Sequence, residues 1–164
     1  MLALASGLDD RAVEAHREEK SISAEETYEV DLRGSAALTA QLLRLADKAT
    51  ARLRAHGLVA GRVSVKIRTA DFTTHTRQRS LEPATHNFAV VSAAAKLLLD
   101  QWLAPQPEAA VRLLGVSVGS LQTAAQADLF DCGGDAGARL DAAVDGIRDR
   151  FGAGMLTRAS LLLS

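Results

Sequence analysis

The chain has 164 residues, 48% of them hydrophobic, which is enough for one packed domain and some additional segments. Its single cysteine excludes a disulfide within the chain, and its four histidines lack the spacing of metal ligands. We identify neither a secretory signal nor an apolar run of the ~20 residues that a membrane span needs, so we expect a cytoplasmic protein without membrane contact. The formal net charge is only −1, so any basic surface must be local.

The N-terminal part of the sequence predicts a strand followed by a long helix. Residues 1–19 read as a helical fragment and a charged linker. In residues 21–32 the alternation places small apolar side chains inward and serines outward. Residues 35–56 form an amphipathic helix, because leucines recur at helical spacing behind Ser35, which can cap the first turn.

The middle of the chain, residues 61–81, reads as two strands joined by a turn near Asp71. Alternation gives the first strand an apolar face with Val63, Val65 and Ile67, and an outward face with Arg62, Ser64, Lys66 and Arg68. We expect the open face of the sheet to carry Lys66, Arg68 and, from the second strand, Arg77. Cations among small hydroxyl groups suit a phosphate backbone, although a solvated sheet face with no partner explains the same pattern.

The remaining elements complete a two-layer fold. A second helix follows Asn87, with an inner apolar stripe and two prolines at its end. Residues 111–118 form a fourth strand, which gives the order β-α-β-β-α-β. This order predicts an α+β two-layer sandwich, a four-stranded sheet with two helices on one face and the other face open. A further, C-terminal helix is expected at about 135–151, with one apolar face formed by Leu140, Val144, Ile147 and Phe151.

Three segments, in this order, resemble the C-terminal part of Y-family translesion DNA polymerases of the DinB (polymerase IV) type. Residues 4–32 resemble the end of the thumb, the linker and the first strand of the little finger domain. Residues 61–81 (GRVSVKIRTADFTTHTRQRSL) resemble its central strands, and residues 111–121 (VRLLGVSVGSL) its last strand. The little finger fold has the same β-α-β-β-α-β order. The resemblance divides the chain into a thumb remnant and linker at 1–19, the little finger at 20–121, a linker at 122–134, and a C-terminal helix and tail at 135–164.

The resemblance implies a DNA-gripping module of an error-prone, lesion-bypass polymerase, which acts at the nucleoid. Such a module holds the phosphates of a primer-template duplex with its open sheet face. The DNA contacts carried over to this sequence are Ser21, Ser23, Lys66, Arg68, Arg77, Arg79 and Arg112. Beside Arg112, residue 113 is a leucine where some relatives have a second basic residue.

The catalytic parts of such a polymerase are not expected in this chain. These enzymes hold two Mg²⁺ ions with clustered carboxylates of a palm domain. The adjacent pairs Asp9-Asp10 and Glu25-Glu26 have no matching third ligand. We therefore expect no catalytic residue, metal site or cofactor here, and no polymerase activity from this chain alone.

Residues 126–130 (QADLF) match the pattern Gln-x-x-Leu-Phe, which resembles the sliding-clamp binding motif of bacterial polymerases. A flexible linker would present the amide of Gln126 to a polar pocket, while Leu129 and Phe130 enter an apolar cleft of the clamp, the β subunit of the replicative polymerase. Alternatively, Leu129 and Phe130 pack on the C-terminal helix.

Two other functions fit the same sequence. The same fold order occurs in regulatory α/β sandwiches that bind small ligands, although we find no nucleophile–base pair and no glycine-rich phosphate loop. The chain could also be a pure protein-interaction module whose functional site is residues 126–130.

Overall fold

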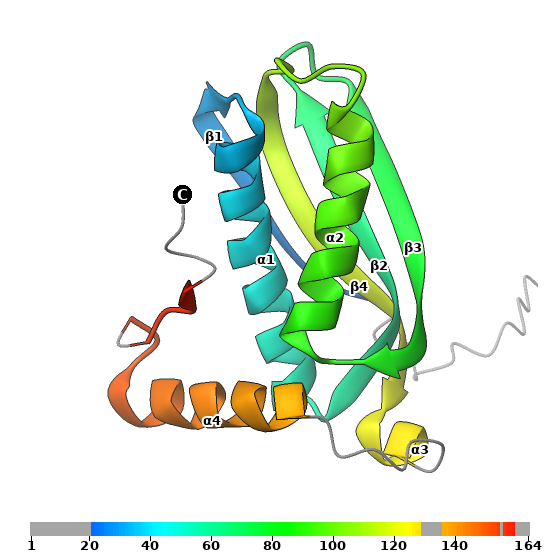
Figure 1. Cartoon of the computed structure of the whole chain (residues 1–164), viewed down its shortest axis with the longest axis vertical. Coiled ribbons are helices and arrows are strands. Elements are labelled where there is room, and N and C mark those ends of the chain that lie inside the picture. Colours follow the sequence, from blue (N-terminus) through cyan, green and yellow to red (C-terminus); the bar gives the residue numbers. More distant parts are fainter. Residues whose placement is uncertain (1–20, 129–135, 155, 160–164) are drawn as a thin grey trace, which may run out of the picture.

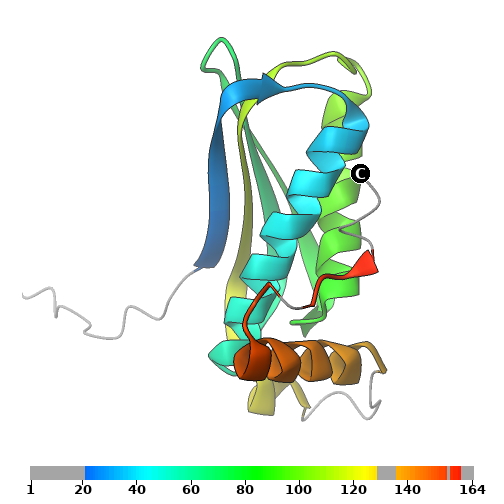
Figure 2. The same ribbon diagram turned by 90° about the vertical axis from the view of Figure 1, so that its left-hand side faces the viewer.

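The computed structural model describes residues 21–128, 136–154 and 156–159. Its elements are β1 (Ser21–Leu32), α1 (Ser35–Ala55), β2 (Leu58–Thr69), β3 (Thr74–Thr85), α2 (Phe88–Leu103), β4 (Val111–Thr123), α3 (Ala124–Asp128) and α4 (Ala136–Phe151). The strands form one antiparallel sheet in the order β1-β4-β2-β3, so β1 and β3 are its edges. Helices α1 and α2 lie side by side on one face, and the opposite face carries no described helix (Figures 1 and 2). The predicted α+β two-layer fold is confirmed.

The core lies between the sheet and these two helices. Val63, Val65 and Ile67 of β2 pair with Val118, Val116 and Leu114 of β4, and all six are fully buried. Residues that pair across antiparallel strands project from the same face, so they form one continuous apolar surface. The helices cover it with fully buried side chains that include Leu38, Leu42, Leu45, Leu53, Val91 and Leu99. Each such side chain contributes about 1.5–3 kcal/mol relative to an exposed one.

Local signals fix the ends of both helices. The side-chain oxygen of Asn87 accepts the N–H of Ala89 at 2.8 Å and so caps α2. Helix α1 is bounded by Gly34, with φ of 84°, and Gly57, with φ of 63°, conformations that glycine adopts without strain. The predicted cap, Ser35, is therefore the first helical residue rather than the N-cap.

The C-terminal helix α4 crosses the ends of α1 and α2 (Figure 1). Of the four apolar residues predicted on one face, Val144 is buried as expected, whereas Leu140, Ile147 and Phe151 are 59%, 41% and 63% exposed. The buried residues of α4 are Asp141 and Val144. The helix docks with a partly charged face, because ion pairs and not apolar contacts alone hold it against the domain.

The region after the last strand is more regular than predicted. Strand β4 continues to Thr123, five residues beyond the expected end at 118, and α3 follows at once. The predicted linker at 122–134 therefore begins with strand and helix. The predictions for residues 1–19 and for Leu129 and Phe130 concern positions outside the described residues.

Candidate nucleic-acid interface

The open face is the sheet face directed away from the helices, and the pairing of the strands shows which residues lie on it. Pairing aligns four rows across β1, β4, β2 and β3: Ser21–Gly119–Arg62–Ser80, Ser23–Ser117–Ser64–Gln78, Glu25–Gly115–Lys66–Thr76 and Thr27–Leu113–Arg68–Thr74. These residues alternate with core residues, so their side chains project away from the helices. The rows consist mainly of small and hydroxyl-bearing residues, with three cations and one acid among them.

One of the three cations, Lys66, already forms an ion pair within the domain. Its Nζ lies 3.2 Å from Glu25 Oε2, across the intervening strand β4. Gly115 occupies the position between them, and a Cβ there would lie 3.0 Å from the Cβ of Glu25. The missing side chain of Gly115 thus lets Glu25 and Lys66 meet over β4. For Lys66 to contact a phosphate, its ion pair with Glu25 would have to break.

The other two cations form no ion pair with an acidic side chain in the described residues. Arg68 Nε donates to the hydroxyl of Thr74 at 2.9 Å, which orients the guanidinium without neutralising it. Arg62, which the predicted site left out, is exposed and contacts no acidic side chain in the described parts of the chain. The signal for Arg62 was present in the sequence, because it alternates with the same core residues as Lys66 and Arg68.

Arg112 joins the open face where the register of β4 shifts. Leu32 and Val111 pair and pack into the core, so their neighbours Asp31 and Arg112 project from the open face. Arg112 Nε donates to Asp31 Oδ1 at 3.1 Å, and its guanidinium carbon lies 4.9 Å from the ring centroid of Phe72. Arg112 is therefore compensated by an acid, as Lys66 is.

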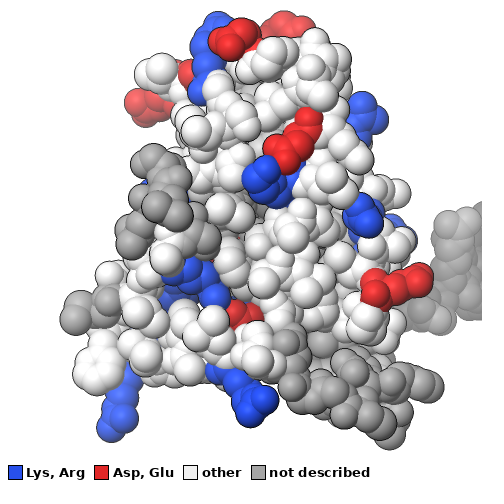
Figure 3. Space-filling model, viewed as in Figure 1, with Lys and Arg blue, Asp and Glu red and all other residues white. Residues whose placement is uncertain are grey.

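The structure corrects the predicted place of Arg77. Arg77 pairs with Val65, and Arg79 with Val63, so both arginines project from the helix side of β3 and not from the open face. Both are exposed, and neither forms an ion pair within the described ranges. Figure 3 shows basic atoms, and below them acidic atoms, at this margin of the helix side. Arg77 and Arg79 flank the open face across the β3 edge.

Charge is divided between the two halves of the sheet. Strand β1 has four acidic residues and no basic one: Glu25, Glu26, Glu29 and Asp31. Strands β2 and β3 together have five basic residues and one acidic one: Arg62, Lys66, Arg68, Arg77 and Arg79, against Glu82. A polyanion is therefore attracted to the β2–β3 half and repelled by the β1 edge. Ser21 and Ser23 are both exposed on the open face. They belong to the acidic strand β1 but lie at its start, before the first of its acidic residues.

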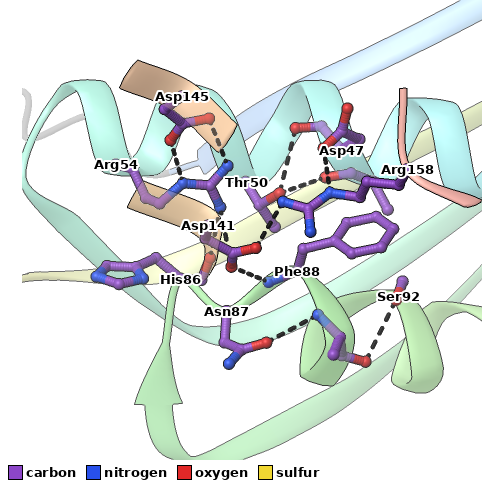
Figure 4. A network of polar contacts seen from close by, with 12 residues as sticks. Asp47, Thr50, Arg54, His86, Asn87, Phe88, Ser92, Asp141, Asp145 and Arg158 are labelled. Atoms are coloured by element: carbon purple, nitrogen blue, oxygen red, sulfur yellow. Dashed lines mark hydrogen bonds and ion pairs between the residues drawn. The ribbon is translucent and has the colours of Figure 1, made fainter. Parts of the chain in front are cut away.

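A buried ionic network fixes α4 to the helix side of the domain (Figure 4). The Asp141 carboxylate accepts the backbone N–H of Phe88 at 2.8 Å, Arg158 Nη2 at 2.5 Å and Arg54 Nη1 at 3.4 Å. Its side chain is only 3% exposed. A negative charge at the first turn of α2 is also favoured by the helix dipole. One aspartate thus connects α4 with α1, α2 and the segment after α4.

Helix α1 supplies both signs of charge to this network. Arg54 Nη2 donates to Asp145 Oδ1 at 3.1 Å. The carboxylate of Asp47 lies 2.9 Å from Arg148 and 3.1 Å from Arg158. These partners are far apart in the sequence, so no local pattern reveals them. A groove between α1 and α4 lies beside them, lined in part by Arg44, Lys48 and Arg139.

The predicted clamp motif begins in α3. Gln126 is exposed, and its side-chain oxygen accepts the backbone N–H of Thr123 at 3.3 Å. Thr123 directly precedes the helix, so Gln126 forms one half of a capping box. Its amide is therefore already in use locally and would have to leave the cap to bind another protein.

The described residues include no group of three or more His, Cys, Asp or Glu side chains placed to hold a metal ion. Within the same ranges, no helix combines the length and apolar character needed to cross a membrane.

The geometry defines a two-layer α+β domain with one uncovered, partly basic sheet face. Residues 19–129 match the model of the impB/mucB/samB family C-terminal domain. This match spans most of the chain, and the chain belongs to this family.

The similar proteins agree with this assignment. DNA polymerase IV of Streptomyces coelicolor is 42% identical over 130 residues, which cover 79% of this chain and 26% of that protein. DNA polymerase IV of Dehalococcoides mccartyi strain BAV1 is 40% identical over 149 residues, which cover 90% of this chain and 38% of that protein. The chain thus spans between about a quarter and two fifths of the length of these curated relatives.

Solved structures share the fold at low sequence identity. A Y-family DNA polymerase chimera matches with a TM-score of 0.58 and 16% identity, over 65% of this chain and 30% of that one. The insertion ternary complex of Dbh DNA polymerase matches with a TM-score of 0.56 and 14% identity, over 63% of this chain and 29% of that one. These likenesses concern the fold.

Proposed function

We propose that this chain grips a primer-template duplex by its phosphates, as the DNA-holding module of a lesion-bypass DNA polymerase. The observation that carries the proposal is the pair Arg62 and Arg68, which lie on an uncovered sheet face and have no acidic partner in the described residues. They are six positions apart on β2, or about 20 Å at about 3.3 Å per residue. That distance corresponds to about six nucleotides of one DNA strand. The Mg²⁺-dependent chemistry of such a polymerase is assigned to other parts of it.

The edge of the sheet adds to this grip. Arg77 and Arg79 extend from β3 on the helix side, so a duplex lying on β2 and β3 meets cations from both sides of the edge strand. Ser21 and Ser23 supply hydroxyl groups at the far end of the open face. Lys66 and Arg112 contribute where a phosphate replaces their acidic partners.

Binding of this kind depends on phosphates rather than on base sequence, because the open face carries no described helix that could enter a groove and read the bases. Fluorescence anisotropy with a labelled primer-template duplex tests it. We expect binding at low salt that weakens linearly on a log–log plot as salt rises, and similar affinities for unrelated sequences. Absence of binding at low salt would overturn the proposal in favour of a ligand-binding sandwich or a pure protein-interaction module.

A second function, tethering to a sliding clamp, is favoured by the position of residues 126–130. The segment starts within α3, three residues after β4 ends at Thr123, and Gln126 is exposed there. We propose that Gln126, Leu129 and Phe130 bind the β clamp of a bacterial replicative polymerase, with the two apolar side chains as anchors. Such a tether raises the effective concentration of the attached module at DNA.

The tether can be tested separately from the DNA grip. In surface plasmon resonance with an immobilised bacterial clamp, Leu129→Ala/Phe130→Ala should abolish binding, since both anchors are lost. Arg62→Ala/Arg68→Ala is the control and should bind the clamp like the wild type. Equal clamp affinity of the wild type and the Leu129→Ala/Phe130→Ala variant would contradict the proposal.

A further inference from the structure

Phe72 is exposed at the tip of the β2–β3 hairpin in a conformation that costs energy. Its side chain is 64% exposed, and its backbone φ is 66°. A bulky residue is rare in this left-handed region, where glycine or asparagine fits with less strain. A polar residue would also expose less apolar surface to water. Apart from the contact of the ring with Arg112, the described residues give no folding reason for a phenylalanine at this position.

The turn around Phe72 is held by Asp71. The Asp71 carboxylate accepts the backbone N–H of Thr73 at 3.1 Å, the hydroxyl of Thr73 at 3.0 Å and the hydroxyl of Thr69. The hydrogen bonds from Thr69 and Thr73 hold the pKa of Asp71 below its ordinary value. The N–H of Phe72 donates to the carbonyl of Thr69 at 2.9 Å. These contacts set the position of the ring before any ligand arrives.

One guanidinium contacts the ring, and a second cation lies on the open face just before the turn. The Arg112 guanidinium lies over the ring at 4.9 Å from its centroid and is itself anchored to Asp31 at 3.1 Å. Arg68, which forms no ion pair in the described residues, is the last open-face residue of β2 before the turn. The row of cations along β2 thus ends at an exposed aromatic side chain stacked on an arginine.

We infer that Phe72 is a stacking site for an unpaired nucleobase next to the gripped duplex. The inference rests on the proposed function. Aromatic side chains bind bases of any sequence, because every base has a π-face, and cations beside the ring bind the attached phosphate. Inside a duplex both faces of a base are covered, so the site selects a single-stranded extension of a primer-template. The neighbouring Arg68 and Arg112 favour this polyanion over an apolar pocket of another protein.

The test compares two DNAs with the same duplex part, one blunt and one with a 5′ overhang. By anisotropy, Phe72→Ala should bind the overhang DNA about tenfold more weakly than the wild type, as for the loss of one stacked base. Its affinity for blunt duplex should not change. Phe72→Trp should restore overhang binding, and its fluorescence should be quenched by that DNA. Trp102, the chain's one tryptophan, is 3% exposed, so its emission should form a constant background that DNA bound at the hairpin does not quench.

The outcomes separate this inference from the function on which it rests. Equal overhang affinity of the wild type and Phe72→Ala overturns the stacking site and leaves the duplex grip in place. A similar loss on blunt and overhang DNA also overturns it, because the contact would then be to the duplex. Failure of the wild type to bind either DNA overturns the grip itself and the stacking site with it. Thermal melting of both variants confirms that they are folded.

Discussion

Replacing Asp141 by alanine is expected to lower the free energy of unfolding by about 3–5 kcal/mol, the usual cost of breaking a buried ion pair on one side. The loss is large because a single carboxylate serves Arg54, Arg158 and the backbone N–H of Phe88. Without it, two guanidinium groups that are 8% and 11% exposed lose an anionic partner. Domains of this size are stable by only about 5–15 kcal/mol, so the variant should unfold far more readily.

Asp149 provides a matched control on the same helix. It is exposed and forms no ion pair within the described residues, so Asp149→Ala should change the free energy of unfolding by less than about 0.5 kcal/mol. Urea denaturation followed by circular dichroism measures both variants. A similar, small change for Asp141→Ala and Asp149→Ala would show that the ionic network does not stabilise the domain.

The double variant Arg62→Ala/Arg68→Ala is expected to bind duplex DNA roughly 60-fold more weakly at 0.1 M salt. Each lost phosphate contact removes the release of roughly 0.9 counterion, which at that salt is worth roughly 0.9 of a decade in affinity. The two arginines are the open-face cations that no acid compensates, so their loss should exceed that of Lys66 or Arg112. Anisotropy with a blunt duplex measures the effect without a contribution from unpaired bases.

Arg44 and Lys48 of α1 supply the control for charge alone. Both are exposed, and both line the groove between α1 and α4 on the other side of the molecule. Arg44→Ala/Lys48→Ala removes the same net charge and should reduce duplex affinity only slightly. Equal losses for the two double variants would mean that DNA responds to the total charge of the chain and not to the open face.

The order of elements and the core residues could be predicted because they depend on local patterns. Alternation along one strand identified Val63, Val65 and Ile67 as buried, and the helical periodicity of α1 did the same for its leucines. The face on which Arg77 lies could not be derived in this way. It depends on how β3 is aligned with β2, which the turn between them sets. Because Arg68 pairs with Thr74, Arg77 is paired with Val65. A shift of one residue would have placed Arg77 with Lys66 on the open face.

The face by which α4 docks on the domain could not be predicted from the sequence either, for a different reason. Its apolar residues share one helical face, and burial of that face is the usual expectation. The helix docks through ion pairs: Asp141 and Asp145 pair with Arg54, and Arg148 pairs with Asp47. These partners lie about ninety to a hundred positions earlier in the chain. Such pairings depend on tertiary structure alone. The conformation of Phe72 was hidden for the same reason, since only the completed turn defines its φ.

The measurement that tests the DNA grip most directly is the salt dependence of duplex binding, recorded side by side for the wild type and Arg62→Ala/Arg68→Ala. The slope of log affinity against log salt counts the phosphates that the protein neutralises. If Arg62 and Arg68 each neutralise one phosphate, the slope of the double variant is shallower by about two. Equal slopes for the two proteins would contradict the assignment of the open face as the phosphate-binding surface.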